Sequence, residues 1–243
     1  AEAMTGRRDP ARDMEAARAI ARQAAALGGR AYYVGGFVRD RLLGRENTDV
    51  DIEVHGLTPQ QLEEILDGLG GRLEMGASFG IYGLKGYGLD IAMPRRERAI
   101  GRGHRDFDVT VDPFLGTEQA ARRRDFTINA LAYHPARGII DPFGGVADME
   151  RGVLRSVGDP TTRFSEDALR ILRACRFASQ LGVAIDPATF EAMIACKNLL
   201  RQVSGERVYR ELERFVCGDY VHDALMACVD VLAFVLPELV AMK

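Results

Sequence analysis

The stretch NTDVDIEVHG, residues 47–56, alternates apolar and acidic side chains and is the strongest local constraint on how this chain folds. Side chains at every second position of a β-strand point to the same face. The apolar residues at 50, 52 and 54 would therefore share one face, and Asp49, Asp51 and Glu53 would share the other. Like charges in a row repel, so the acidic face is either solvated, as on any half-exposed strand, or neutralised by a bound cation. The decapeptide alone leaves both readings open.

The composition bounds the class of protein. The 243 residues allow one large domain or two modest ones, and 47% hydrophobic residues are enough to build a core. The sequence contains no run of 18 apolar residues, and no signal-peptide core follows the N-terminus, which predicts a cytoplasmic protein without a membrane span. A formal net charge of −3 argues against an indiscriminate nucleic-acid binder but leaves room for local basic surfaces.

The positions of the cysteines indicate that their side chains pack in the core. The four cysteines, at 175, 196, 217 and 228, form no C-x-x-C pair, and each lies among apolar residues with helical spacing. This pattern predicts buried thiols and argues against zinc ligands or disulfides.

Periodicity and turn residues predict the order of the elements. Helices are expected at 10–27, 37–44, 58–70 and about 117–132, strands at 31–36 and 47–56, a β-hairpin at 79–93, a mobile charged loop at 94–108 and a turn at 141–145. From residue 165 glycine thins out and the apolar spacing becomes helical throughout. The chain is therefore predicted to form an α/β domain over residues 1–145, followed by an all-helical segment over residues 146–243.

A glycine pair precedes the acidic strand. In VGGFVRD, residues 34–40, a strand ends in Gly35 and Gly36 before a helix, so backbone N–H groups could approach a phosphate closely, with Arg39 one turn further on. A Gly-Gly pair is more often only a turn. The spacing to Asp49 strengthens the functional reading, because ten residues suffice to run down one helix and return as the adjacent strand.

Two carboxylates on one strand face suit magnesium. Mg²⁺ prefers oxygen ligands and is usually held by one or two carboxylates together with substrate phosphates. Asp49 and Asp51 could bridge two such ions, which would activate an attacking hydroxyl and stabilise a pyrophosphate leaving group. Metal binding would also relieve the repulsion within the acidic row.

The motifs together resemble a known family. VGGFVRDRLLGRENTDVDI, RRRDFTINALAY (122–133), DPFGG (141–145), SEDALRILRACRF (165–177) and, more loosely, GERVYRELERF (205–215) resemble class II tRNA nucleotidyltransferases, the CCA-adding enzymes, and their bacterial poly(A) polymerase relatives, within the DNA polymerase β superfamily. The resemblance implies an α+β fold, in which a nucleotidyltransferase head with a small mixed β-sheet flanked by helices (1–145) precedes an all-helical neck (146–243).

The resemblance also assigns residues. Asp49 and Asp51 become the catalytic, metal-binding pair, and Gly35, Gly36, Arg39 and Arg124 become nucleotide contacts. Asp125 would help to hold the site together. Asp90, in GLDIAM, is the best candidate for a third carboxylate on a neighbouring strand, although a solvated hairpin residue is an equally open reading.

The resemblance assigns recognition of the nucleotide base to the motif SEDALRILRACRF. Asp167, Arg170, Arg173 and Arg176 recur every third residue, and the resemblance implies that the first two read the base and the last two contact the nucleotide. An aspartate can accept from the amino group of cytosine or adenine, and an arginine can donate to the neighbouring acceptors. Uracil and guanine present a carbonyl at that point and would leave the carboxylate unpaired, which gives strong rejection. A solvated charged face is the alternative.

The position within the family follows from two stretches. FGIYGLKGYGLDIAMPRRE stands where a poly(A) polymerase would carry an RRF-type stretch, and the full-length loop at 94–108 is typical of members that add A as well as C. The expected activity is template-independent addition of C and A to the 3′ end of tRNA from CTP and ATP with Mg²⁺, without a membrane or an obligate protein partner. A poly(A) polymerase, a CC-only or A-only relative, and a weakly active nucleotide- or RNA-binding fragment remain alternatives.

Family members carry helical body and tail regions beyond the neck, which bind tRNA. Here the sequence ends at VLPELVAMK, about where a neck leads into a body. We therefore expect either a fragment or a natural minimal enzyme, with weak tRNA affinity in both cases, because the missing surface supplies phosphate contacts and shape recognition.

Overall fold

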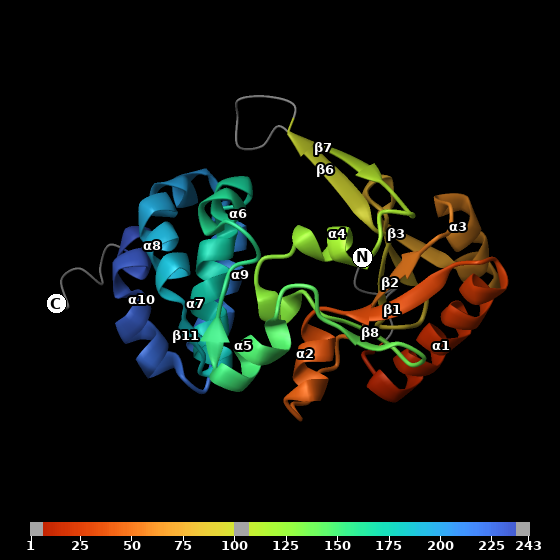
Figure 1. Ribbon diagram of the computed structural model, residues 1–243, viewed down its shortest axis with the longest axis horizontal. Helices are drawn as coiled ribbons and strands as arrows, with labels where there is room; N and C mark the ends of the chain where they lie inside the picture. The colour runs from red at the N-terminus through yellow and green to blue at the C-terminus, as the bar shows by residue number, and fades with distance from the viewer. Residues whose placement is uncertain (1–6, 100–106, 237–243) are drawn as a thin grey trace. The chain divides into compact units, whose positions relative to one another are not determined.

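The computed structural model describes residues 7–99 and 107–236 and divides them into two compact units (Figure 1). The first unit comprises residues 7–99, 107–122 and 129–142, and the second comprises residues 123–128 and 143–236. The sequence predicted a single boundary after residue 145, whereas the structure divides the chain after Pro142 and assigns residues 123–128 to the second unit.

A seven-stranded mixed sheet is the centre of the first unit. Its strand order is β3-β4-β5-β2-β1-β8-β9, and β2 and β5 run parallel, whereas the other neighbouring strands are antiparallel. The strands are β1 (Arg30–Val34), β2 (Asp51–His55), β3 (Arg72–Gly76), β4 (Ile81–Leu84), β5 (Asp90–Ala92), β8 (Ala132–His134) and β9 (Gly138–Ile140). The predicted acidic strand is thus a central strand of the sheet, with neighbours on both sides.

Two of the α-helices of the first unit begin at capping side chains. The α-helices of this unit are α1 (Pro10–Ala26), α2 (Gly36–Leu42), α3 (Pro59–Gly68) and α4 (Thr117–Arg122). The Asp9 side chain accepts from the backbone of Arg12 at the start of α1, and Thr58 and Gln61 form a reciprocal capping box on α3. These contacts satisfy backbone N–H groups that the first helical turn leaves without a partner.

The core of this unit lies between α1, α3 and one face of the sheet. Ile52 and Val54, the apolar half of the alternating strand, pack in one cluster with Ile20 of α1 and with Leu62 and Leu66 of α3. The alternation in β2 therefore works as predicted on its apolar side, and it turns Asp51 and Glu53 to the opposite face.

The predicted helix over 117–132 is wrong in its second half. The helix ends at Arg122, a 3₁₀ turn covers Thr127–Asn129, and β8 begins at Ala132. The carboxylate of Asp125 accepts a hydrogen bond from the backbone of Phe126 at 2.8 Å. A side chain that bonds its own backbone in this way offers the chain an alternative to the helical ladder, and the apolar spacing beyond it belongs to the second core.

The predicted mobile loop over 94–108 is wrong at both ends. Residues Arg95–Ala99 form β6 and Phe107–Val111 form β7, which pair as a separate antiparallel ribbon, while residues 100–106 lie outside the described part of the chain. Arg96 pairs with Asp112, one residue past the end of β7, at 3.0 Å. β6, RRERA, lacks the hydrophobic alternation of a strand, whereas β7, FDVTV, has it. β3 was also not foreseen.

The second unit is mostly helical. It contains α5 (Gly145–Arg151), α6 (Pro160–Glu166), α7 (Leu169–Leu181), α8 (Pro187–Cys196), α9 (Gly205–Val216) and α10 (Val221–Val235), with a 3₁₀ helix at Lys197–Gln202. α7 packs against both α9 and α10 (Figure 1). The prediction of an all-helical segment needs correction, because β10 (Val153–Leu154) and β11 (Ala184–Ile185) form a short parallel pair.

The core of the second unit surrounds α7. Leu169, Leu172 and Phe177 are buried there, and Phe126 contributes an edge-to-face contact with Phe177 at a ring separation of 5.9 Å. The cysteines at 175, 196 and 228 are buried and that at 217 is exposed, and all four thiols are free. The prediction of buried thiols is therefore confirmed for three of the four.

Asp148 ties together the segment that opens the second unit. Its carboxylate, 2% exposed, accepts from the hydroxyl of Thr127 at 2.6 Å and pairs with Arg151 at 2.9 Å and with Arg155 at 3.3 Å. Burial alone would raise the pKa of Asp148, but the hydrogen bonds from Thr127 and Arg151 and the charge of Arg155 lower it below its ordinary value. Asp148 therefore stays ionised inside the fold.

No helix in the described ranges is long and apolar enough to cross a membrane. The longest of them, α1, has 17 residues, against the roughly 20 apolar residues that a bilayer requires.

Candidate active site

The register of the sheet brings two carboxylates together. Asp51 is the first residue of β2 and Asp90 the first residue of β5, and the two are direct partners in the parallel pair. Partners in neighbouring strands point to the same face, with the strands about 4.8 Å apart. The structure therefore places Asp90 beside Asp51, as expected of a third carboxylate on a neighbouring strand.

Asp49 lies just before β2 and shares a cation with Asp90. The Arg8 Nη1 atom lies 3.1 Å from Oδ1 of Asp49 and 3.4 Å from Oδ2 of Asp90. One positive group thus reaches both carboxylates, which is direct evidence that their oxygens converge. An oxygen donor set that already holds one cation fits the ligand preference of Mg²⁺.

The protonation of Asp90 responds to the same neighbours. Burial raises the pKa of Asp90 above its ordinary value, the guanidinium of Arg8 opposes the rise, and the negative charge of Asp49 adds to it. The exposed carboxylate of Asp49 and the half-buried one of Asp90 therefore favour a positive charge between them.

Glu53 is separated from this site. It is 4% exposed, and its Oε1 atom lies 2.7 Å from Nε2 of His55. The alternative of a solvated acidic face does not hold for Glu53, because its carboxylate is buried against an imidazole. Only its place in the alternating row linked Glu53 to the site, and its carboxylate contacts His55 instead.

The glycine pair forms a tight turn between β1 and α2. Gly35 adopts a φ of +67°, a conformation that favours glycine, and its N–H donates to the carbonyl of Leu131 at 3.1 Å. α2 begins at Gly36. A Cβ at Gly36 would lie 3.3 Å from Nη2 of Arg39, so the guanidinium lies directly against the turn.

Arg39 is buried rather than open to solvent. It is 6% exposed, its Nε donates to Asp40 at 2.9 Å, and its Nη1 donates to the side chain of Asn129. The bond to Asn129 connects α2 to the 3₁₀ turn that precedes β8.

Two residues that the sequence did not single out, Asp40 and Asn47, connect Arg39 to the segment that carries Asp49. Asn47 donates from Nδ2 to Oδ2 of Asp40 at 2.7 Å, and its Oδ1 accepts from the backbone N–H of Asp49 at 2.7 Å. Asp40 in turn accepts from Arg39. The backbone that carries Asp49 is thereby held by a continuous chain of hydrogen bonds.

In the second unit, Asp167 lies between two helices. It follows α6 and precedes α7, and it does not share one helix with the arginines as the spacing predicted. Its Oδ1 accepts from the backbone N–H of Leu169 at 3.1 Å, and its Oδ2 accepts from Arg207 of α9 at 2.8 Å. Arg207 lies within the loosest of the sequence motifs and was not singled out.

The first two arginines of α7 face carbonyl and carboxylate groups. Arg170 donates to the carbonyls of Arg163 and Arg123 and pairs with Glu166 at 2.9 Å. Arg173 pairs with Asp125 at 2.7 Å. The structure thus joins Arg170 and Arg173 to the RRRD motif within one unit, and it places Arg124 in the same turn, half-buried.

Arg176 is the most enclosed of the three. It pairs with Glu211 of α9, and both side chains are 8% exposed. Its guanidinium also lies 4.3 Å from the ring centre of Phe177. This arginine binds α7 to α9.

No group of three or more His, Cys, Asp or Glu side chains stands assembled as a metal site in the described ranges. A magnesium site that relies on two carboxylates and substrate phosphates needs no such group.

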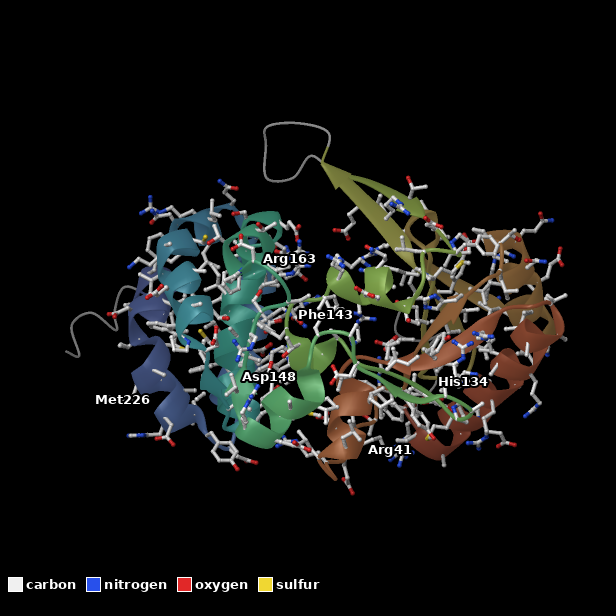
Figure 2. All side chains as sticks on the ribbon, viewed as in Figure 1. Arg41, His134, Phe143, Asp148, Arg163 and Met226 are labelled. Carbon is white, nitrogen blue, oxygen red and sulfur yellow. The ribbon has the colours of Figure 1, made fainter. Side chains whose placement is uncertain are left out.

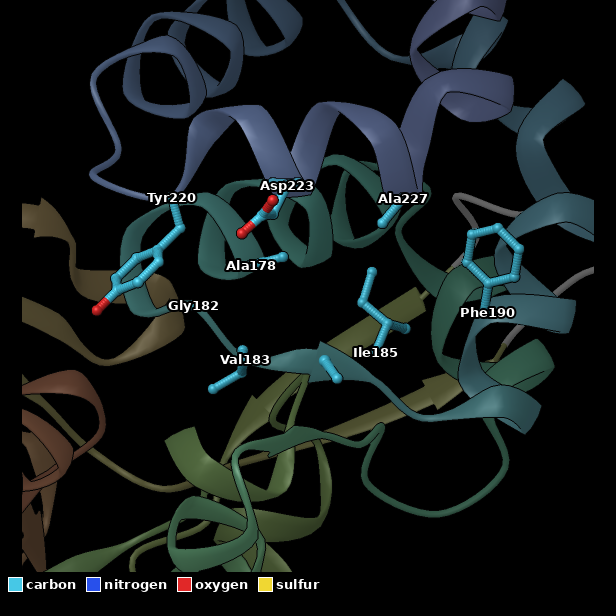
Figure 3. Close-up of a pocket in the computed structure, with 10 residues that line it drawn as sticks. Ala178, Gly182, Val183, Ile185, Phe190, Tyr220, Asp223 and Ala227 are labelled. Carbon is cyan, nitrogen blue, oxygen red and sulfur yellow. The ribbon is translucent and has the colours of Figure 1, made fainter.

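An apolar cavity of about 470 Å³ opens in the second unit. It lies between the end of α7, β11, α8 and α10, and its lining includes Val183, Ile185 and Phe190, with Tyr220 and Asp223 at one side (Figure 3). None of the predicted site residues lines it.

Comparison with known proteins identifies the family. The family described as the poly A polymerase head domain matches residues 31–155, more than half of the chain. The chain belongs to this family. A second family, described as the probable RNA- and SrmB-binding site of polymerase A, matches residues 182–242. Nucleotidyltransferases of this kind generally use a divalent metal ion.

The relatives carry one activity in their names. A CCA-adding enzyme of Streptococcus suis is 39% identical over 216 residues, which is 88% of this chain and 52% of the relative. A multifunctional CCA protein of Xylella fastidiosa is 38% identical over 223 residues, which is 88% of this chain and 51% of the relative. The resemblance found in the sequence is thereby confirmed.

Solved structures agree in fold. The Bacillus stearothermophilus CCA-adding enzyme in complex with CTP matches with a TM-score of 0.77 and 35% identity over 89% of this chain and 51% of its own. The Thermotoga maritima CCA-adding enzyme complexed with tRNA-CCA matches with a TM-score of 0.75 and 28% identity over 95% of this chain and 54% of its own. The chain spans about half the length of these relatives, and the predicted mixed α and β fold is confirmed.

Proposed function

We propose that this chain is an RNA nucleotidyltransferase that adds C and A to the 3′ end of tRNA from CTP and ATP and releases pyrophosphate. The observation that carries the proposal is the convergence of the Asp49 and Asp90 carboxylates on one cation, with Asp51 the direct partner of Asp90 in the sheet. The relatives named CCA-adding enzymes support the choice of reaction. tRNA and both nucleotides are found in the cytoplasm, where we place the activity.

Asp49 and Asp51 would hold two Mg²⁺ ions, with Asp90 as an additional ligand. When bound, Mg²⁺ would activate the attacking 3′-hydroxyl and stabilise the leaving pyrophosphate. Asn47 holds the backbone of Asp49, and the strand pairing holds Asp51 beside Asp90, so the carboxylates keep their positions before substrate arrives. Preorganised charge of this kind costs no rearrangement during the reaction.

The nucleotide contacts are proposed from the resemblance to the family. The backbone of Gly35 and Gly36 would bind phosphate oxygens, and Arg124 would contact the nucleotide. Asp167, with Arg170, would read the amino edge of cytosine or adenine, and Arg173 would complete the pocket. Nucleotide contacts by Arg39 and Arg176 stay predictions, and their burial favours a supporting role beneath the turn and between α7 and α9.

The test is nucleotide incorporation by a double variant. The chain is incubated with tRNA that ends before CCA, with Mg²⁺ and with CTP or ATP singly and together, and the products are sized. We expect Asp49→Ala with Asp51→Ala to abolish incorporation. The control is Glu64→Ala, an exposed carboxylate on α3, which should leave incorporation unchanged. Undiminished incorporation by the double variant would rule out the mechanism.

A poly(A) polymerase is the second candidate, because the matching family carries that description. The same experiment separates the two: a CCA-adding enzyme stops after one A, whereas a poly(A) polymerase continues. Products that end after two C residues, or that gain A only, would identify a CC-only or A-only enzyme. A nucleotide- or RNA-binding fragment would give no products.

A further inference from the structure

A groove of about 850 Å³ in the first unit carries three arginines. It runs over α1, α2 and the segment between α2 and β2, and each of these supplies one arginine: Arg18, Arg41 and Arg45. Met14 and Phe37 contribute apolar surface. Arg41 lies near the end of α2 (Figure 2). The groove was not evident from the sequence, because its residues come from separate segments.

The three arginines carry uncompensated charge. All three are exposed, and none forms an ion pair with another residue of the described ranges. Exposed arginines elsewhere in this protein pair readily, as Arg122 does with Glu118 and Arg210 with Glu206. One carboxylate, that of Glu46, also lines the groove. In a chain of net charge −3, three unneutralised arginines in one groove predict an anionic ligand.

The charges of two of the arginines act on the same half-buried ring, that of Tyr33. Burial raises the pKa of Tyr33, and the charges of Arg18 and Arg41 both oppose the rise. Arg41 also lies over the ring of Phe37, with 5.4 Å between the guanidinium carbon and the ring centre. The guanidinium groups of α1 and α2 therefore border one apolar surface made by aromatic side chains.

The groove leads to the catalytic strand. Asn47 and Thr48 line it, and the next residue is Asp49, whose backbone bonds to Asn47. A strand of nucleic acid bound in the groove would place its end at the carboxylates.

We propose that this groove binds the sugar-phosphate backbone of the RNA strand whose 3′ end is extended, with phosphates on Arg18, Arg41 and Arg45. The inference rests on the proposed function and adds the surface that guides the RNA. The three arginines come from three segments, which suits successive phosphates of a strand better than one compact triphosphate. Apolar surface between basic groups is typical of sites for single-stranded nucleic acid.

The test measures RNA affinity as a function of salt. A fluorescent acceptor mini-helix with a single-stranded 3′ end is titrated with the chain at several salt concentrations, without nucleotide. Each phosphate contact contributes about 0.7–0.9 to the slope of log K against log salt. We expect the triple variant Arg18→Ala, Arg41→Ala, Arg45→Ala to lower the slope by about two to three and the affinity at low salt by at least tenfold.

The matched control is Arg30→Ala. Arg30 is exposed and begins β1 at the end of the strand opposite to Gly35, and its partner in the sheet is His55, at the end of β2 opposite to Asp51. Arg30→Ala removes one positive charge from the same unit, so the salt slope and the RNA affinity of this variant should stay close to those of the unaltered chain. Circular dichroism of each variant verifies that the fold is retained.

The outcomes separate this inference from the proposed function. An unchanged slope in the triple variant, or an equal loss for Arg30→Ala, would overturn the inference even if the unaltered chain incorporates CTP. A triple variant that loses CTP affinity and keeps RNA affinity would also overturn it, because the groove would then hold the triphosphate. A lowered slope supports it whether or not the unaltered chain incorporates nucleotide.

Discussion

The buried pair between Arg176 and Glu211 offers a sharp test of how the second unit is held together. Both side chains are 8% exposed, and they connect α7 to α9. Glu211 also lies 3.9 Å from Arg173. Burial lowers the pKa of Arg176 to about 10, and the charge of Glu211 opposes that effect. Glu211→Ala would leave a buried guanidinium without its carboxylate.

The structure allows an estimate of how much Glu211→Ala lowers the free energy of unfolding. Removing one partner of a buried ion pair costs about 3–5 kcal/mol. Arg176 would keep its contact with the ring of Phe177 and a long hydrogen bond, 3.4 Å, to Gln180. These remaining contacts place the expected cost of Glu211→Ala at the lower end, about 3 kcal/mol. Glu211→Gln keeps an acceptor and removes the charge, so its cost should be about 1–2 kcal/mol.

The assay combines urea unfolding with hydrogen exchange. For a urea dependence of about 2 kcal/mol per molar, a loss of 3 kcal/mol corresponds to a midpoint lowered by about 1.5 M. Because a chain with two units need not unfold in one step, amide exchange is read separately over α7 and α9 and over α1. Exchange should accelerate in α7 and α9 and stay unchanged in α1.

The control is Glu213→Ala, an exposed glutamate on the same helix, for which we expect a change within about 0.5 kcal/mol. If Glu211→Ala lowers the free energy of unfolding by less than about 1 kcal/mol, the pair does not hold α7 to α9. Equal acceleration in α1 would refute the assignment of the effect to the second unit.

Four further outcomes are expected. Asp167→Ala should relax discrimination against UTP and GTP in single-nucleotide incorporation, and retained selectivity would remove Asp167 from base reading. The folded pKa of Asp148 lies below its unfolded value of about 3.9. Its contribution to stability is therefore present above that pH and is lost as the pH falls through the folded pKa. Asp148→Asn should accordingly flatten the fall in urea midpoint between pH 6 and pH 3. In Gly145→Ala the new Cβ would lie 2.1 Å from the carbonyl oxygen of Thr127, so the midpoint temperature of thermal unfolding should fall by several degrees. An unchanged midpoint would show that the backbone at Thr127 moves to make room for the methyl group. Arg8→Ala removes a competitor for the two carboxylates and should strengthen Mn²⁺ binding, measured by paramagnetic resonance, up to about fivefold, since an exposed pair contributes up to about 1 kcal/mol; weaker binding would mean that Arg8 assists the metal.

Elements with strong local signals were predictable from the sequence. α1 and α3 lie within two residues of their predicted bounds, because Pro10, Thr58 and Pro59 mark helix starts through short-range chemistry. The alternation in β2 correctly separated an apolar face from an acidic one. The hairpin of β4 and β5 also follows from its own residues.

Elements that depend on distant partners were not predictable. The second half of the expected helix at 117–132 carries helical spacing, but Phe126 and Ile128 belong to the core of the second unit, so tertiary packing overrides the periodicity. β6, RRERA, lacks hydrophobic alternation, and it pairs with β7 as an antiparallel ribbon. No local window marks β6 as a strand, whereas β7, FDVTV, does alternate and carries a local strand signal that the prediction of a loop passed over.

In the candidate site, too, the types of the residues could be read from the sequence, whereas their partners in the fold could not. The residue types of Asp49, Asp51 and Asp167 carried their chemistry in the sequence, whereas the groups that hold them in place came from elsewhere in the chain. Arg207 reaches Asp167 across 40 residues, and Arg8 reaches Asp90 across 82. Asn47 stands only two residues from Asp49, yet its role depends on Asp40, which is fixed by Arg39 beneath the glycine turn. A motif therefore predicts candidate reacting groups, and the hydrogen bonds that hold them can be assigned only once the fold is known.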